Sequence, residues 1–205
     1  VIFINKPSGM LSQKAKPEDV SLVEYLIAHL IHEGTINVSD LASFKPGVCN
    51  RLDRNTSGIV AAGKTTKGLQ QLSEAFKLRT LGKYYLCIVK GRVAKRALIK
   101  GYLYKDNKTN KVTISRTEIK DSLPIETEYI PVCSNGNVTL LKIHLLTGRS
   151  HQIRAHLASI GHPLIGDYKY GSKQINDTFN RQFKVKDQML HSYELDIPDM
   201  DIHIY

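Results

Sequence analysis

The sequence predicts an α+β domain built on a mixed, mostly antiparallel β-sheet with flanking helices. Segments that read as strands outnumber those that read as helices, and the two kinds do not alternate regularly as they would around a parallel sheet. An Asn-Gly pair in "SNGN", at residues 134–137, is a strong signal for a tight antiparallel hairpin. The 205 residues are enough for one substantial core, and we expect a single domain over residues 1–205.

Hydrophobic spacing and turn residues place the individual elements. The first helix is expected to begin after the N-cap Ser21. Its apolar face would comprise Leu22, Tyr25, Leu26 and Leu30. The first half is expected to hold strands at 1–7, 44–49 and 57–64 and helices at 21–30 and 65–79. The second half is expected to hold strands at 83–91, 97–104, 111–116, 127–133 and 138–146 and a helix at 151–163.

The charge of the chain narrows the class of partner. The sequence has 29 Lys and Arg against 19 Asp and Glu, a net charge of +10. This excess favours nucleic acid or an acidic membrane surface, although it can also serve solubility alone. No stretch approaches the roughly 18 apolar residues of a membrane span, and the first residues do not resemble a signal peptide. Cys49, Cys87 and Cys133 lack zinc-site spacing, so we expect reduced thiols in a cytoplasmic protein.

The stretch "NRLDRNTSG" places one carboxylate, Asp53, between Arg51 and Arg54 in a loop between two expected strands. Adjacent guanidinium groups can keep a carboxylate ionised and oriented for nucleophilic or general-base chemistry. An ion pair in an exposed turn would explain the same residues, and taken alone the stretch favours that simpler explanation.

The helix expected at 151–163 carries an arginine near its start. Ile153, Leu157 and Ile160 would form the apolar stripe of this helix. Arg154 lies about 100° around the helix from Ile153, at the edge of the buried face. Its guanidinium could therefore reach into a site while its stem packs against the core.

Polar residues gather just before this arginine, in "TGRSHQIRAH". Arg149, His151 and Gln152 lie at the helix start, where backbone N–H groups favour phosphate. His151 and His156 are five residues apart, whereas a helical metal pair requires a spacing of four. We therefore expect no metal site here.

The strand at 83–91 carries two adjacent tyrosines. Alternation places Tyr85, Cys87 and Val89 on one face and Tyr84 on the other. Packing within the sheet is the simpler explanation for both rings. An aromatic ring that lines a basic cleft could instead stack on an unstacked nucleobase.

Together these motifs resemble the RluA-type family of RNA pseudouridine synthases. "RLDRNTSGIVAAGK" is similar to the catalytic-aspartate motif of that family. "KYYLCIVKG" resembles its K-x-Y-x-A-x-V-x-G strand, with Cys87 where alanine is usual. "LLTGRSHQIRAHLASIGHPLIGDYKYG" is similar to its G-R-x-H-Q-I-R motif and the G-H-P-I-x-G-D-x-x-Y-G segment that follows. "NKPSGML" and "QMLHSYELDIP" also fit, so the resemblance covers nearly the whole chain.

The resemblance implies roles for individual residues. Asp53 would be the catalytic aspartate, and Arg154 would pair with it. Tyr85 would lie against the target base, and Arg51 would enter the RNA as the uridine flips out. Asn50 departs from the family, which more often has His before Arg-Leu-Asp, and this difference concerns an RNA contact rather than the chemistry.

The resemblance also implies a central active-site cleft and an RNA substrate, with ribosomal RNA favoured over transfer RNA. The isomerisation breaks the bond between C1′ and N1 and rejoins the base through C5, so we expect no cofactor. Asp53 could attack C1′ or remove the C2′ proton, and the sequence leaves both routes open. The family often carries an S4-type RNA-binding domain upstream, which we do not expect in this chain. We expect a monomer, because no long apolar surface stretch stands out.

A basic segment at residues 83–100, which includes Lys83, Lys95 and Arg96, is expected to contact the RNA backbone. Two other classes of function remain. The first is a catalytically silent RNA-binding module, which the intact set of Asp53, Tyr85 and Arg154 argues against. The second is a metal-dependent hydrolase, which the histidine spacing argues against.

Overall fold

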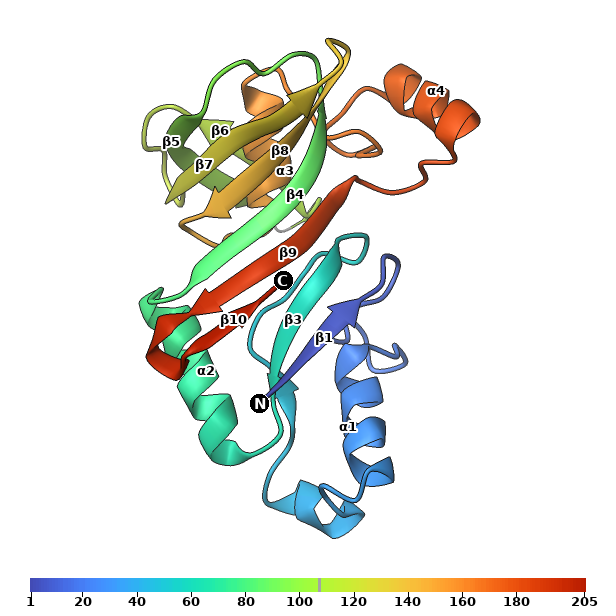
Figure 1. Cartoon of the computed structure of the whole chain (residues 1–205), viewed down its shortest axis with the longest axis vertical. Helices are drawn as coiled ribbons and strands as arrows, with labels where there is room; N and C mark the ends of the chain where they lie inside the picture. The colour runs from blue at the N-terminus through green and yellow to red at the C-terminus, as the bar shows by residue number, and fades with distance from the viewer. Residues whose placement is uncertain (107) are drawn as a thin grey trace. The chain divides into compact units, whose positions relative to one another are not determined.

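The computed structural model describes residues 1–106 and 108–205 (Figure 1). The chain divides into two compact units. The first unit comprises Val1–Leu81 and Glu194–Tyr205, and the second comprises Gly82–Tyr193. Strand β9 (Leu190–Ile197) therefore begins in the second unit and ends in the first. Among the described residues, no helix is long and apolar enough to span a membrane.

The first unit combines antiparallel strand pairs with two α-helices. Strand β3 pairs with both β1 and β2, and β10 pairs with β9. In the register of β1 and β3, Lys6 lies opposite Gly58. The elements are β1 (Ile2–Lys6), α1 (Leu22–His32), the 3-10 helix η1 (Val38–Ala42), β2 (Gly47–Val48), β3 (Ser57–Gly63), α2 (Thr66–Leu78), the 3-10 helix η2 (Pro198–Met200) and β10 (Ile202–Ile204).

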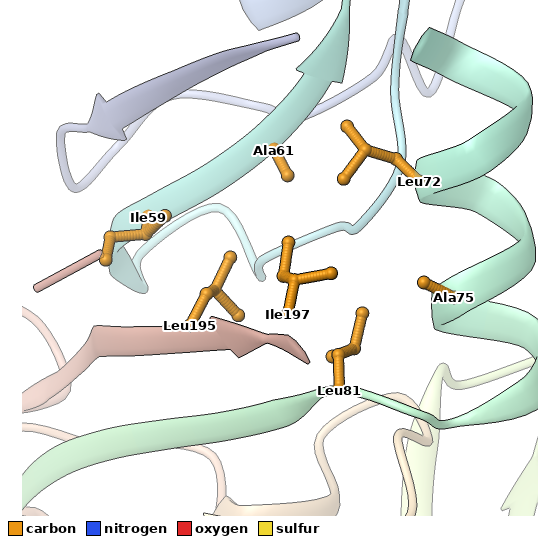
Figure 2. Packing of buried hydrophobic residues seen from close by; sticks show 7 residues of the cluster. All are labelled: Ile59, Ala61, Leu72, Ala75, Leu81, Leu195 and Ile197. Carbon is orange, nitrogen blue, oxygen red and sulfur yellow. The ribbon is translucent and has the colours of Figure 1, made fainter. Parts of the chain in front are cut away.

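Helix α2 packs against β3 and the end of β9 through an apolar cluster (Figure 2). The cluster comprises Ile59, Ala61, Leu72, Ala75, Leu81, Leu195 and Ile197. Close packing here depends on Gly63, since a Cβ at that position would lie 2.5 Å from the Leu69 Cα. The cluster fixes β3, the strand that follows the loop carrying Asp53.

Helix α1 begins as the sequence predicts. The Ser21 hydroxyl accepts from the Val23 N–H at 3.4 Å, and Glu24 accepts from the Ser21 N–H at 2.9 Å. This reciprocal capping box satisfies donors that the first turn would otherwise leave open. The predicted apolar face is wrong at Tyr25, which is 57% exposed, because the buried positions follow the four-residue rows of Leu22, Leu26 and Leu30.

The second unit contains an antiparallel sheet in the order β4-β8-β7-β5-β6. Helix α3 packs against β6 and β7, and Ala155 of this helix joins an apolar cluster with Leu103, Val112 and Ile125. The elements are β4 (Gly82–Lys90), β5 (Ala97–Asp106), β6 (Lys111–Ser115), β7 (Leu123–Ser134), β8 (Val138–Leu145), α3 (Gln152–Ser159) and α4 (Lys173–Phe183).

The structure confirms the predicted α+β class and the hairpin between β7 and β8, in which Gly136 adopts a positive φ of 87°. The predicted amphipathic stripe of α3 is wrong in detail. All of Gln152–Leu157 is buried, whereas Ile160 lies beyond the last turn and is exposed. The expected strand at 44–49 shortens to the two residues of β2, and α4, β9 and β10 were not predicted.

Candidate active site

The loop that carries Asp53, residues 50–56, is called the Asp53 loop and lies between β2 and β3 in the first unit. Its first residue is anchored to β3: the Asn50 Oδ1 accepts from the Ala61 N–H at 2.8 Å, and its Nδ2 donates to the Ile59 carbonyl at 3.2 Å. Asn50, which departs from the usual family residue, therefore has a local structural role.

A turn at residues 7–12, the N-terminal turn, holds the backbone on both sides of Asp53. The Ser12 hydroxyl donates to the Leu52 carbonyl at 2.9 Å and accepts from the Leu52 N–H at 3.0 Å. Two further bonds end on carbonyls of the loop: Gly9 N–H to Arg54 at 2.9 Å and the Ser8 hydroxyl to Asn55 at 3.1 Å. These bonds fix the path of the loop, because each joins segments more than 35 residues apart in sequence.

Lys6 lies at the end of β1 and is fully buried. Its ammonium donates to the carbonyls of Pro7 at 2.9 Å, Met10 at 2.9 Å and Arg54 at 3.0 Å. Burial lowers the pKa of Lys6 to about 8, and the negative charge of Asp53 opposes this decrease. The Asp53 loop is therefore accompanied by a buried cation that no motif assignment had identified.

The two arginines that flank Asp53 differ in what they contribute. Both side chains are exposed, while the Asp53 side chain is partly exposed. The Arg54 carbonyl accepts from both Gly9 and Lys6, so the backbone of this residue anchors the loop. The role of Arg51 as the residue that enters the RNA stays a prediction.

Arg154, in the second unit, is held by a buried carboxylate. Its Nε and Nη2 donate to the two oxygens of Asp167 at 2.7 and 3.0 Å, a bidentate pair in which Asp167 is only 1% exposed. The guanidinium carbon also lies 5.2 Å from the centre of the Tyr170 ring. Asp167 itself accepts from the backbone N–H groups of Lys169 and Tyr170. The pairing of Arg154 with Asp53 stays a prediction.

His151 precedes helix α3 in a left-handed conformation, with φ 54° and ψ 17°. Such a conformation is uncommon for a residue other than glycine and requires support from its surroundings. The His151 Nδ1 lies 2.8 Å from the Tyr170 hydroxyl, which also accepts from the Val112 N–H at 3.0 Å. Tyr170 therefore links the start of α3, strand β6 and the guanidinium of Arg154.

The contact of Gln152 with RNA stays a prediction, and in this structure its side chain is buried with every hydrogen-bonding position used. Its Oε1 accepts from the Thr147 hydroxyl and from the Arg149 N–H. Its Nε2 donates to the Glu126 carbonyl and to the Thr127 hydroxyl, both at 3.0 Å. Gln152 therefore ties the turn before α3 to strand β7. Arg149 next to it is partly buried, and its Nε is enclosed without a hydrogen-bond partner among the described residues.

Tyr85 is 7% exposed and shares the buried face of β4 with Cys87 and Val89, as alternation predicts. Lys83 lies on the same face at 8% exposure, and a Cβ added to Gly148 would lie 3.6 Å from its ammonium. Lys83 thus lies beside the turn that leads to Arg149, apart from the solvated residues with which the sequence grouped it.

Lys95 and Arg96, the other members of the predicted basic segment, are exposed. The Arg96 guanidinium pairs with Glu128 at 2.8 Å, which neutralises part of the charge at this position. Contact of these two residues with an RNA backbone stays a prediction.

His156 belongs to the interior of the second unit. Its Nδ1 lies 3.0 Å from the Thr127 hydroxyl, and burial lowers its pKa to about 4. Within the described ranges, no three His, Cys, Asp or Glu side chains gather in a group that could hold a metal ion.

Residues 1–159 match the RNA pseudouridylate synthase family. This match covers more than half of the chain. The chain belongs to the RNA pseudouridylate synthase family. The resemblance drawn from the motifs is thereby confirmed, and two relatives described below place the chain with the RluA type.

Curated relatives in this family come from several bacteria. An uncharacterized RNA pseudouridine synthase of Mycoplasma genitalium is 35% identical over 98% of this chain and 62% of its own length. The ribosomal large subunit pseudouridine synthase D of Borreliella burgdorferi is 33% identical over 96% of this chain and 58% of its own length. The ribosomal large subunit pseudouridine synthase C of Haemophilus influenzae is 31% identical over 95% of this chain and 57% of its own length. The chain thus spans about three fifths of the length of these pseudouridine synthases.

Two solved human structures share the pseudouridylate synthase fold. RNA pseudouridylate synthase domain containing 4 superposes with a TM-score of 0.77 at 20% identity, covering 98% of this chain and 83% of that chain. RNA pseudouridylate synthase domain containing 1 superposes with a TM-score of 0.73 at 22% identity, covering 98% of this chain and 77% of that chain.

Sequence reasoning missed the residues that hold the predicted site residues of this pseudouridylate synthase family member. Lys6 and Ser12 fix the Asp53 loop, while Asp167 and Tyr170 fix Arg154. All but Ser12 lie inside motifs that supported the family resemblance. A charged residue within an apolar or glycine-rich motif was the available signal for Lys6 and Asp167.

Proposed function

We propose that this chain isomerises uridine to pseudouridine in structured RNA, with Asp53 as the reactive carboxylate. Family membership supports the reaction. The observation that carries the role of Asp53 is the fixed backbone on both sides of it, combined with a side chain that stays partly exposed. A carboxylate held in this way has the orientation that catalysis needs and remains within reach of a substrate.

The proposed reaction balances without any co-reactant. The bond between C1′ and N1 breaks, the uracil turns, and a bond forms between C1′ and C5. The hydrogen on C5 leaves as a proton, and N1 gains one. Asp53 can act as a nucleophile at C1′ or as the base that removes the C2′ proton, and both routes need an ionised carboxylate.

Two residues of the second unit are proposed to assist. Tyr85 would stack on the uracil, which loses its neighbours when it leaves the helix. Arg154 would provide the positive charge that keeps the reactive carboxylate ionised. The buried bidentate bond to Asp167 supports a fixed orientation of this guanidinium, which would otherwise sample many rotamers, although Asp167 also offsets part of its charge.

We propose ribosomal RNA as the substrate in preference to transfer RNA. Relatives from Borreliella burgdorferi and Haemophilus influenzae are named as ribosomal large subunit pseudouridine synthases. The net charge of +10 supports binding to a nucleic acid of either kind.

Tritium release from RNA labelled at uridine C5 tests the proposed activity, because bond formation at C5 must expel that hydrogen. We would assay the protein on ribosomal and transfer RNA transcripts without added metal or cofactor. Release should accompany an equal amount of pseudouridine in the digested RNA and should be faster with ribosomal RNA. No release from either RNA, with binding intact, would favour the catalytically silent RNA-binding module.

A further inference from the structure

Helix α4, drawn in orange-red in Figure 1, is fixed to the second unit near its start and again just beyond its end. The Asn176 side chain is 1% exposed, and its Oδ1 accepts from the Gly166 N–H at 2.9 Å. The chain then returns past the same glycine, since a Cβ at Gly166 would lie 3.0 Å from the Val185 side chain and overlap the Asp187 carbonyl. Residues 181–186, called the α4 tip, lie around this return and are exposed except at Val185.

The α4 tip combines one exposed aromatic ring with three cations. Phe183 is 65% exposed, whereas the other four phenylalanines of the chain are partly buried. The Phe183 and Phe179 ring centres are 5.6 Å apart, so Phe179, one turn earlier, supports the exposed ring. Arg181, Lys184 and Lys186 are exposed, and no acidic residue occurs from position 178 to position 186. Within the described residues, no carboxylate pairs with either lysine.

Lys184 occupies a backbone position that favours glycine. It is the C-cap of α4, in the left-handed conformation with φ 59° and ψ 27°, and its N–H donates to the Asn180 carbonyl at 2.9 Å. Glycine adopts this conformation most easily because it has no Cβ. A cation at this end also suits the helix dipole, so the charge alone does not reveal its role. Replacement by glycine separates the two possibilities, because it removes the charge and relieves the backbone.

Residues 166–168 connect α4 with the proposed active site. Asp167 holds the guanidinium of Arg154 at 2.7 and 3.0 Å. The next residue, Tyr168, donates from its hydroxyl to Asp177 of α4 at 3.0 Å. The helix and the arginine are therefore held by the same short segment. An RNA that reaches Arg154 is bound by the same unit that carries the α4 tip.

We propose that the α4 tip binds a single-stranded segment of the substrate RNA, with Phe183 stacked on an unpaired base and the three cations against its phosphates. This inference rests on the proposed function, because it takes RNA as the substrate. An exposed ring surrounded by cations is a common way to hold single-stranded RNA without reading its sequence. An acidic membrane would also attract the cations, but one exposed ring offers little of the apolar area that an amphipathic anchor needs.

The first test measures binding of a fluorescent uridine oligomer of about 12 nucleotides to the full chain. Phe183→Ala should weaken binding by about 10-fold, as expected for one lost stacked base, and Phe183→Tyr should stay within about twofold because it keeps a ring. Phe183→Leu keeps an apolar side chain without the ring and should bind nearly as weakly as Phe183→Ala. Tyr25→Ala removes a ring of α1 that is 57% exposed, and it should bind as the wild type does.

Two results of this titration would overturn the inference. The first is a Phe183→Leu variant that binds as tightly as the wild type, because the ring would then not stack. The second is a wild type that binds a ribosomal RNA transcript but not the oligomer.

The second test compares Lys184→Gly with Arg79→Gly. Arg79 is the matched control, since it is the exposed C-cap of α2 and adopts the same left-handed conformation, with φ 60° and ψ 34°. Both variants should resist urea at least as well as the wild type. Lys184→Gly should also lower the slope of log binding constant against log salt by about 0.7, as for one lost contact to a single strand, and Arg79→Gly should not. Equal slopes in the two variants would overturn the inference.

Turnover separates the inference from the proposed function. Phe183→Ala should keep the wild-type kcat on ribosomal RNA while KM rises by about 10-fold, because the α4 tip does not touch the reacting atoms. A lowered kcat with an unchanged KM would overturn the inference while the function stands. A wild type that releases no tritium from any RNA overturns the proposed function, and the oligomer titrations still decide the inference. If Phe183→Ala keeps its RNA affinity but no longer binds phosphatidylserine vesicles, the α4 tip is a membrane contact and the inference is overturned.

Discussion

Asp53 and Arg154 are positioned in different ways. In the first unit, hydrogen bonds from Lys6 and the N-terminal turn end on the backbone around Asp53, at Leu52, Arg54 and Asn55. In the second unit they end on the side chain of Arg154 itself, through Asp167.

The difference follows from the length of the two side chains. An aspartate has two rotatable side-chain bonds, so a fixed backbone places its carboxylate closely. An arginine loses about 2 kcal/mol of rotamer entropy when it is ordered, and a fixed backbone leaves its head mobile. Direct anchoring of the guanidinium is therefore needed. We therefore expect the stability of the second unit to depend on one buried ion pair. The stability of the first unit should depend on several hydrogen bonds that are neutral or that end on the backbone.

The largest effect should come from Asp167→Asn. This change leaves the buried guanidinium of Arg154 without its carboxylate, which typically costs about 3 to 5 kcal/mol of unfolding free energy. Urea unfolding measures this loss. The matched control is Asp177→Asn, which removes the exposed partner of Lys173 and should leave the stability almost unchanged. Similar results for the two variants would show that the buried pair does not hold the second unit together.

A second effect concerns His156, whose buried ring is bonded to Thr127. Its pKa is lowered from 6.5 to about 4, so between these values the unfolded chain takes up a proton that the folded protein does not. The contribution of His156 to stability is complete above pH 6.5 and is lost as the pH falls toward 4. Between pH 7 and pH 4.5 the wild type should lose about 2 to 3 kcal/mol more than His156→Gln.

Urea unfolding at the two pH values measures this difference. The same loss in both proteins would place the acid sensitivity elsewhere. The pKa of Lys6 is about 8, whereas that of His156 is about 4. A pH change should therefore alter the stability of the first unit on the alkaline side of neutrality and that of the second unit on the acidic side.

Ser12→Ala probes the neutral bonds of the first unit. The change leaves both the N–H and the carbonyl of Leu52 without the hydroxyl, in a buried location. We expect a loss of about 1 to 3 kcal/mol and a reduced kcat, because Leu52 directly precedes Asp53. Ser43→Ala removes an exposed hydroxyl that donates to the Asp40 carbonyl, which water can replace. A Ser12 variant as stable as this control would contradict the role of the N-terminal turn.

The smallest effect should come from the exposed positive charges. Replacing Lys95 and Arg96 with Gln should weaken RNA binding and flatten its dependence on salt by about one to two phosphate contacts. Arg96 should contribute less than Lys95, since Glu128 already pairs with it. Binding measured over a series of salt concentrations tests this, and an unchanged slope would make the segment a solvated surface only.

Much of the fold followed from the sequence because its signals are local. The Ser21 cap, the Asn-Gly hairpin and the alternation around Tyr85 each depend on a few neighbouring residues. The extent of burial of α3 did not follow, because it depends on the strands that pack around the helix.

The supports of the site were hidden for the same reason. Lys6 bonds to Arg54 across 48 positions, and Arg154 bonds to Asp167 across 13. Spacing rules for single helices and strands do not reach such pairs. The burial of Lys83 was not foreseen, because a basic run in sequence says little about which side of a strand is covered, whereas its position on the Tyr85 face could have indicated burial.

The most direct measurement compares turnover and RNA binding in wild type and Asp53→Asn, using the same C5-tritiated ribosomal RNA for both. We predict that tritium release falls by at least about 1000-fold while the Kd for RNA changes by less than about threefold, because the substitution removes a reacting group and preserves its shape. Release by Asp53→Asn at a rate near that of the wild type would contradict the central claim that Asp53 carries the chemistry.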